Sequence, residues 1–141
     1  MPNSLICVDA SLVVRLVVDT EDDRLPGQWN GWTEAGKQIA APTLLYYEVT
    51  NALYQYQKHQ FLTPEVVEQA LAVSLSLPIH LHGDSGLHLL ARKFAQRFSL
   101  LVTYDAHYLA LADQLGAQFW SADRRLVRKV QSQLDWVHLF T

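Results

Sequence analysis

Short apolar runs alternate along the chain with longer stretches in which apolar residues recur every three or four positions. Runs of this length are typical of buried strands, and the longer stretches have the period of amphipathic helices. The predicted strands are 5–8, 38–41, 79–82, 100–103 and 118–121, with a possible last strand at 136–139. Regular alternation of strands and helices predicts an α/β fold, a three-layer α/β/α sandwich around a central parallel sheet of four or five strands.

Several of the predicted helices carry recognisable start and stop signals. Ser11 is a candidate cap for the first helix, and Thr63-Pro64 combines a hydroxyl cap with proline at the first helical position. Pro78 ends the helix that begins at Thr63, and Gly116 stops the helix predicted over 106–115. The remaining predicted helices cover about 28–35, 43–58, 86–98 and 123–131.

The stretch from Leu100 to Arg125 predicts a strand–helix–strand unit. The apolar run 100–103 and the run 118–121 would be parallel strands joined by a right-handed crossover helix. Asp105 and Asp123 would then follow the carboxyl ends of these strands, about 5 Å apart if the strands are neighbours. Open α/β sheets place their sites at this edge.

Two further acids belong to the same predicted edge. Asp9 follows the first strand, and Glu48 lies about two turns into the helix after the second strand. Any one of the four could instead cap a helix or face solvent. As a cluster they need a cation or bound protons, because two carboxylates ~4 Å apart repel by about 4 kcal/mol at an effective dielectric of 20. Oxygen ligands without cysteine suit Mg²⁺ or Mn²⁺.

Length and composition limit the alternatives. The 141 residues predict a single domain, 1–141, and the single cysteine, Cys7, excludes a disulfide framework within the chain. No signal peptide and no transmembrane run is found, so we expect no membrane association and a cytoplasmic location. The net charge of −3 argues mildly against a nucleic-acid binder, although local patches can decide the matter.

Four blocks resemble the PIN domain family, specifically its VapC-type toxin ribonucleases. They are Val8-Asp9-Ala10-Ser11, the segment from Pro42 through Glu48 to Leu53, the segment from Thr103 to Ala112, and Ser121-Ala122-Asp123-Arg124-Arg125-Leu126. The resemblance implies a metal-dependent endoribonuclease, the toxin of a type II toxin–antitoxin pair, with a PIN-like fold.

The resemblance also implies roles for individual residues. Asp9, Glu48, Asp105 and Asp123 would be the catalytic and metal-binding acids, holding Mg²⁺ or Mn²⁺, with one or two ions both possible. Ser121 and Ser11 would support these ligands without touching the metal. The cations Arg15, Arg124 and Arg125 lie near the acidic end and are candidates for RNA contacts; an ordinary solvated helix face is the alternative for the last two.

The implied partners are an RNA substrate, a cognate antitoxin protein and a second copy of the chain. The helices within 43–76 carry more apolar residues than one buried stripe requires, so we expect a homodimer in which these helices form part of an antitoxin groove.

Other functions remain open at this point. An acidic-site phosphohydrolase with an aspartyl nucleophile would have a second acid two residues after Asp9, where this chain has Ser11. A phospho-acceptor receiver domain would have a lysine after a late strand, where Arg124 and Arg125 are the nearest cations. A catalytically inert PIN-like binding module is the third alternative, and a nuclease assay with and without Mg²⁺ would distinguish it.

Overall fold

The computed structural model describes residues 4–141 and contains one five-stranded parallel sheet. The sheet order is β3-β2-β1-β4-β5. The strands are β1 (Leu5–Val8), β2 (Gln38–Pro42), β3 (Ile79–His82), β4 (Gln118–Ser121) and β5 (Val137–Leu139). The helices are α1 (Ala10–Val18), α2 (Arg24–Glu34), α3 (Leu45–Lys58), α4 (Pro64–Ser76), α5 (Gly86–Arg97), α6 (Tyr104–Leu115) and α7 (Arg124–Val130).

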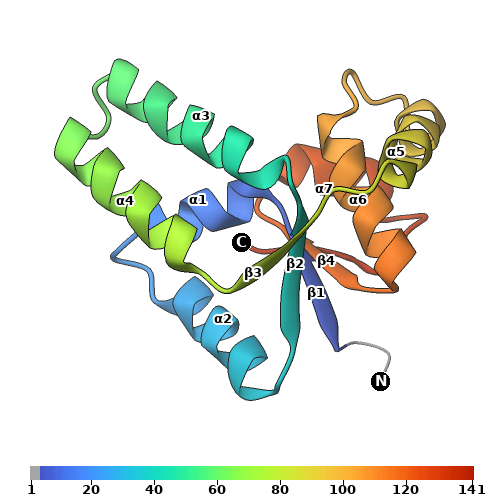
Figure 1. Cartoon of the computed structure of the whole chain (residues 1–141), viewed down its shortest axis with the longest axis horizontal. Helices are drawn as coiled ribbons and strands as arrows, with labels where there is room; N and C mark the ends of the chain where they lie inside the picture. The colour runs from blue at the N-terminus through green and yellow to red at the C-terminus, as the bar shows by residue number, and fades with distance from the viewer. Residues whose placement is uncertain (1–3) are drawn as a thin grey trace.

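The helices cover both faces of this sheet, so the predicted α/β/α sandwich is confirmed. Figure 1 shows α1 to α4 on one side of the strands and α5 and α6 on the other. From β1 the chain moves through β2 to β3 at one edge, then crosses back to β4 and on to β5 at the other edge. The direction of travel therefore reverses between β1 and β4, which are direct neighbours with Cys7 opposite Phe119. Such a switch point opens a crevice at the carboxyl ends of the strands.

The centre of the sheet is built from uninterrupted apolar residues, as strands covered on both faces require. Val8, Ala41 and Phe119 are fully buried. Helix α6 is buried along almost its whole length, because it lies between α5 and the strands β1, β2 and β4. That position accounts for its run of apolar residues, which shows no one-sided stripe.

The predicted strand at 100–103 is wrong. This segment forms bends between α5 and α6, and the side chain of Leu101 is 91% exposed. Helix α5 ends in a turn in which Ser99 has a φ of +52°, and α5 then packs directly against α6 as its neighbour. The short connection between the two helices leaves no room to cross the sheet. An apolar run of four residues cannot be distinguished from an exposed loop by periodicity alone.

Two other boundaries differ from those predicted. Ser11 lies inside α1, and Asp9 is the residue that caps this helix. Helix α2 begins at Arg24 rather than at Gln28, which adds its Leu25 to the core beside Trp29 and Trp32. No helix within residues 4–141 is long and apolar enough to cross a bilayer.

A pair of matched substitutions checks the corrected placement of 100–103. Leu109→Ala in α6 removes a fully buried side chain and should lower the free energy of unfolding by about 2 to 5 kcal/mol. Leu101→Ala should change it by no more than about 0.5 kcal/mol, because the side chain is exposed. Urea denaturation of the two variants measures both values. A large loss for Leu101→Ala would instead place 100–103 in the core.

Candidate active site

The two acids that follow β1 and β4 lie at the switch point of the sheet. Asp9 caps α1, its Oδ1 accepting a hydrogen bond from the amide of Leu12 at 3.1 Å. Asp123 caps α7 in the same way, accepting from the amide of Leu126 at 3.2 Å. Because β1 and β4 are adjacent, the pair that neighbouring strand ends bring together is Asp9 and Asp123. The prediction that Asp105 and Asp123 form this pair is wrong.

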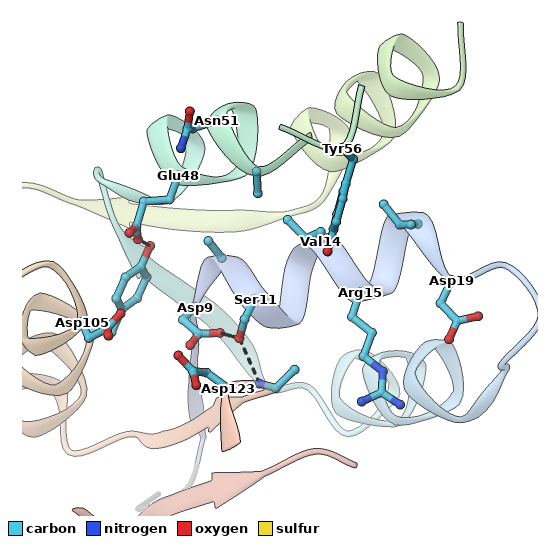
Figure 2. A pocket seen from close by; sticks show the side chains of 15 residues that line it. Asp9, Ser11, Val14, Arg15, Asp19, Glu48, Asn51, Tyr56, Asp105 and Asp123 are labelled. Atoms are coloured by element: carbon cyan, nitrogen blue, oxygen red, sulfur yellow. Dashed lines mark hydrogen bonds between the residues drawn. The ribbon is translucent and has the colours of Figure 1, made fainter. Parts of the chain in front are cut away.

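The other two acids approach from helices. Glu48 is in the first turn of α3, and Asp105 is the second residue of α6. Both face the space in front of Asp9 and Asp123 (Figure 2). All four acids expected from the sequence line one cleft of about 680 Å³, together with Ser11, Asn51 and Tyr56. Asp105 therefore lines the cleft from the start of helix α6 and not from the end of a strand.

Two serine hydroxyls hold the carboxylate of Asp9. Ser11 Oγ donates to its Oδ1 at 2.7 Å, and Ser121 Oγ donates to its Oδ2 at 2.5 Å. Each hydroxyl also accepts from the backbone after β4, Ser11 from the amide of Ala122 and Ser121 from that of Asp123. Asp9 is only 4% exposed, so these contacts replace much of the water that its carboxylate has lost. Both serines thus hold the carboxylate of Asp9, while their predicted role behind a metal ligand stays a prediction.

Sequence reasoning missed one polar residue of this site. The buried phenol of Tyr108 donates a hydrogen bond of 2.6 Å to Oε1 of Glu48. Tyr108 follows Asp105 by three residues in α6, a spacing that places both on one face of the helix. Its apolar neighbours in the sequence conceal this role. The three-residue spacing from an acid was the available signal.

Burial and mutual repulsion make two of the carboxylates hard to ionise. Burial raises the pKa of Asp9 to about 6, although the two serine hydroxyls and the amide of Leu12 act in the opposite direction. Burial, followed by the charges of Asp123 and Glu48, raises the pKa of Asp105 to about 6 as well. A cation in the cleft would relieve this repulsion and favour both ionised forms.

The donor set fits a hard divalent cation by its chemistry. The cleft offers carboxylate oxygens and no thiol or imidazole. Within residues 4–141, however, no three acidic, histidine or cysteine side chains converge tightly enough to form a ready metal cage. Such a cage is not required for Mg²⁺, which usually keeps several waters and binds through one or two carboxylates.

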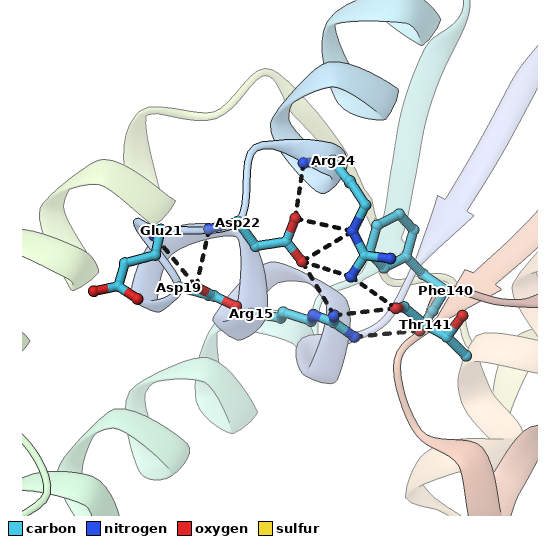
Figure 3. Close-up of polar contacts among 7 residues, drawn as sticks. All are labelled: Arg15, Asp19, Glu21, Asp22, Arg24, Phe140 and Thr141. Carbon is cyan, nitrogen blue, oxygen red and sulfur yellow. Dashed lines mark hydrogen bonds and ion pairs between the residues drawn. The ribbon is translucent and has the colours of Figure 1, made fainter.

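Three cations were predicted to contact RNA, and the guanidinium of one of them, Arg15, is bound to other groups of the protein. It pairs with Asp22 at 3.5 Å and donates to the carbonyls of Phe140 and Thr141, as Figure 3 shows. Arg24 binds the same Asp22 carboxylate and holds its pKa well below the usual range. Arg15 lines the cleft, but its guanidinium fastens residues 140–141 to α1. Arg124 and Arg125 are exposed on α7.

Comparison with known proteins identifies the family of this chain. The model of the PIN domain family matches residues 6–131, so the chain belongs to the PIN domain family. Relatives from two organisms carry the name Ribonuclease VapC3. The one from Mycobacterium tuberculosis is 33% identical over 133 residues, covering 90% of this chain and 88% of the relative. The one from Pyrobaculum aerophilum is 27% identical, covering 88% of this chain and 93% of the relative.

Solved structures show the same fold. PAE2754 from Pyrobaculum aerophilum has a TM-score of 0.68 at 23% identity, covering 92% of this chain and 88% of its own. VapBC2 from Rickettsia felis, bound to a DNA fragment from its promoter, has a TM-score of 0.72 at 10% identity, covering 97% and 99%.

The raised pKa values of Asp9 and Asp105 predict an unusual pH dependence of stability without metal. Between about pH 4 and pH 6 the folded chain binds more protons than the unfolded chain, so its stability falls as the pH rises through this window. Asp9 alone contributes on the order of 3 kcal/mol to this loss. Denaturation in chelator at about pH 5 and pH 7.5 should therefore show greater stability at pH 5.

Asp105→Asn should reduce this pH difference, because one of the two perturbed carboxyls is gone. Asp22 does not affect this comparison, since its lowered pKa changes stability only below about pH 4. Burial lowers the pKa of His138, which makes stability rise with pH in this range, but that contribution is the same in wild type and variant. The same pH dependence in wild type and variant would show that Asp105 ionises normally.

Proposed function

We propose that this protein is a metal-dependent endoribonuclease of the VapC type, a hydrolase that cleaves RNA phosphodiester bonds as the toxin of a toxin–antitoxin pair. The observation that carries the proposal is the meeting of Asp9, Glu48, Asp105 and Asp123 in one cleft at the switch point of the sheet. The full-length relatives named as ribonucleases support RNA as the substrate. No second acid stands two residues after Asp9, where an aspartyl phosphatase would have one; Ser11 is used to hold Asp9 instead.

The four acids are the proposed metal ligands. Asp9 and Asp105 bind Mg²⁺ or Mn²⁺ directly, and Glu48 and Asp123 bind directly or through water. When bound, a divalent cation polarises the scissile phosphate and lowers the pKa of a water molecule.

The protein's own groups orient this site. Ser11 and Ser121 fix the plane of the Asp9 carboxylate. The hydrogen bond from the amide of Leu126 fixes the plane of the Asp123 carboxylate. Tyr108 occupies Oε1 of Glu48, which leaves Oε2 to orient the attacking water and accept its proton. Hydrogen bonds from the protein thus restrict the carboxylates of Asp9, Asp123 and Glu48. Among the described residues, no such hydrogen bond is found for the carboxylate of Asp105.

We propose two protein partners, a cognate antitoxin and a second copy of the chain. Apolar side chains are exposed along α3 and α4 and the turn between them: Tyr47, Tyr54, Phe61, Val66, Val73 and Leu75. Such a surface suits an amphipathic helix or another subunit. The structural relatives include VapBC2 from Rickettsia felis and a toxin–antitoxin complex from Klebsiella pneumoniae, which supports an antitoxin here. We place the protein in the cytoplasm, where its RNA substrate and antitoxin would be made.

Asp105→Asn tests the metal site. The variant should lose RNA cleavage, because a neutral amide is a poor Mg²⁺ ligand. In chelator it should be as stable as wild type or more so, since one of several repelling charges is removed. Mg²⁺ or Mn²⁺ should raise the melting temperature of wild type by binding only the native state, and should raise that of the variant much less. Thermal unfolding with chelator and with metal measures both effects.

Asp113→Asn is the matched control, because Asp113 is exposed on the same helix and does not line the cleft. It should keep cleavage and the full metal response. If Asp105 merely supported its helix, Asp105→Asn would respond to metal as the control does, since Asn is nearly as good as Asp near a helix start. That result would remove Asp105 from the metal site.

Light scattering tests the proposed homodimer. The 16.0 kDa chain should give twice its own mass at micromolar concentration. Replacing Tyr47, which is 77% exposed, with lysine tests whether α3 takes part, and should shift the mass toward the monomer without lowering the melting temperature. A monomeric wild type at high micromolar concentration would refute self-association.

A further inference from the structure

Helix α7 carries a basic strip made of Arg124, Arg125, Arg128 and Lys129. The other three residues of the helix, Leu126, Val127 and Val130, are buried against the core. Every solvent-facing position of α7 is therefore a cation, and the four side chains together line a shallow depression of about 480 Å³. An ordinary solvated helix face mixes both signs of charge.

The arginines of the basic strip differ from the other arginines of the chain in having no partner. Arg15 and Arg24 pair with Asp22, Arg92 donates to Gln96 and Arg97 donates to Gln133. For the strip, no ion pair or side-chain hydrogen bond is found anywhere within residues 4–141. Four of the eleven basic residues thus lie unpaired on one seven-residue helix of a chain with a net charge of −3.

The strip begins directly at the acidic cleft. Asp123, which lines the cleft, is the cap of α7, so Arg124 is its next neighbour. At the far end of the helix, the charge of Lys129 still acts on Asp105 across the cleft. Like charges one turn apart, such as Arg124 and Arg128, repel and lower helix stability. A helix that keeps them without neutralising partners presents a ready site for anions.

We propose that the basic strip binds phosphates of the RNA substrate on one side of the scissile bond and so positions the chain in the acidic cleft. This inference rests on the proposed endoribonuclease function. Cations are needed beside the cleft, because its four carboxylates would otherwise repel the RNA backbone. The contacts are to phosphates rather than to bases, and they position the substrate without selecting its sequence.

The test is the double variant Arg124→Gln/Arg128→Gln, with Arg92→Gln/Lys93→Gln on the exposed face of α5 as the matched control. Both remove two positive charges from one helix, and neither changes Lys129, which acts on Asp105. Binding of a fluorescein-labelled single-stranded RNA is measured in chelator over a range of salt concentrations. For each lost phosphate contact, binding should weaken about fivefold at ~0.1 M salt, and the slope of log K against log salt should fall by about 0.7.

The rate of RNA cleavage gives a second measurement. A purely structural role of the basic strip would not change the enzyme concentration at which this rate is half-maximal. In single-turnover reactions with metal, the double variant should need more enzyme to reach half-maximal rate, while the rate at saturation stays close to that of wild type. Its melting temperature in chelator should equal or exceed that of wild type, since repelling charges are removed. The control should match wild type in binding, salt slope and cleavage.

The outcomes separate the strip from the proposed function. If wild type cleaves RNA and the double variant binds with unchanged affinity and slope, the strip is not an RNA site and the endoribonuclease proposal stands. A lower melting temperature with unchanged binding would make the strip a structural counter-charge to the cleft and also overturn the inference. If wild type cleaves no RNA under any metal but its RNA binding depends on α7, the proposed activity fails; the strip then binds RNA phosphates, and its role in positioning a substrate is overturned.

Discussion

The buried carboxylate of Asp9 is the constraint to which the rest of the site responds. It lies at the end of the central strand β1, 4% exposed, where an ionised group has lost nearly all its water. Two hydroxyls and a helix amide compensate in part, but burial still dominates and holds its pKa near 6. Both serines that bind it are fastened to the backbone after β4. The carboxylate therefore links the ends of the two strands that form the switch point.

The topology concentrates negative charge at this point by two different routes. Asp9 and Asp123 arrive on adjacent strand ends, whereas Glu48 and Asp105 arrive in the first turns of α3 and α6. A helix start is the one place in a helix where a carboxylate gains from the backbone dipole, which offsets part of the repulsion. Burial first, and then the remaining repulsion from Asp123 and Glu48, raise the pKa of Asp105. A divalent cation bound as proposed would relieve this repulsion.

Much of the fold could be predicted from the sequence, because strands covered on both faces are apolar throughout and their runs stand out. The segment 100–103 has the same local composition and is nevertheless a loop, since only the packing of α5 on α6 excludes it from the sheet. Asp105 was placed from this predicted strand, which does not exist; it lines the cleft from the first turn of α6 instead, and its role as a metal ligand stays a prediction. Tyr108 could not be found by pattern, because a tyrosine among alanines and leucines looks like core until Glu48 is seen opposite it.

A protein with a net negative charge and an acidic cleft can act on a polyanion only if its charges are arranged locally. Screening limits exposed charges to a range of about 8 Å in physiological salt, so the overall sign matters less than what lies beside the cleft. On one side of the cleft, the basic strip on α7 provides this local positive charge. On the other side the cleft is lined by Asn51 and Tyr56 of α3, an amide and a phenol that can hydrogen-bond or stack with a base. Phosphate contacts carry no sequence information, so if the basic strip binds phosphates as proposed, the α3 side of the cleft is where contacts to bases would be made.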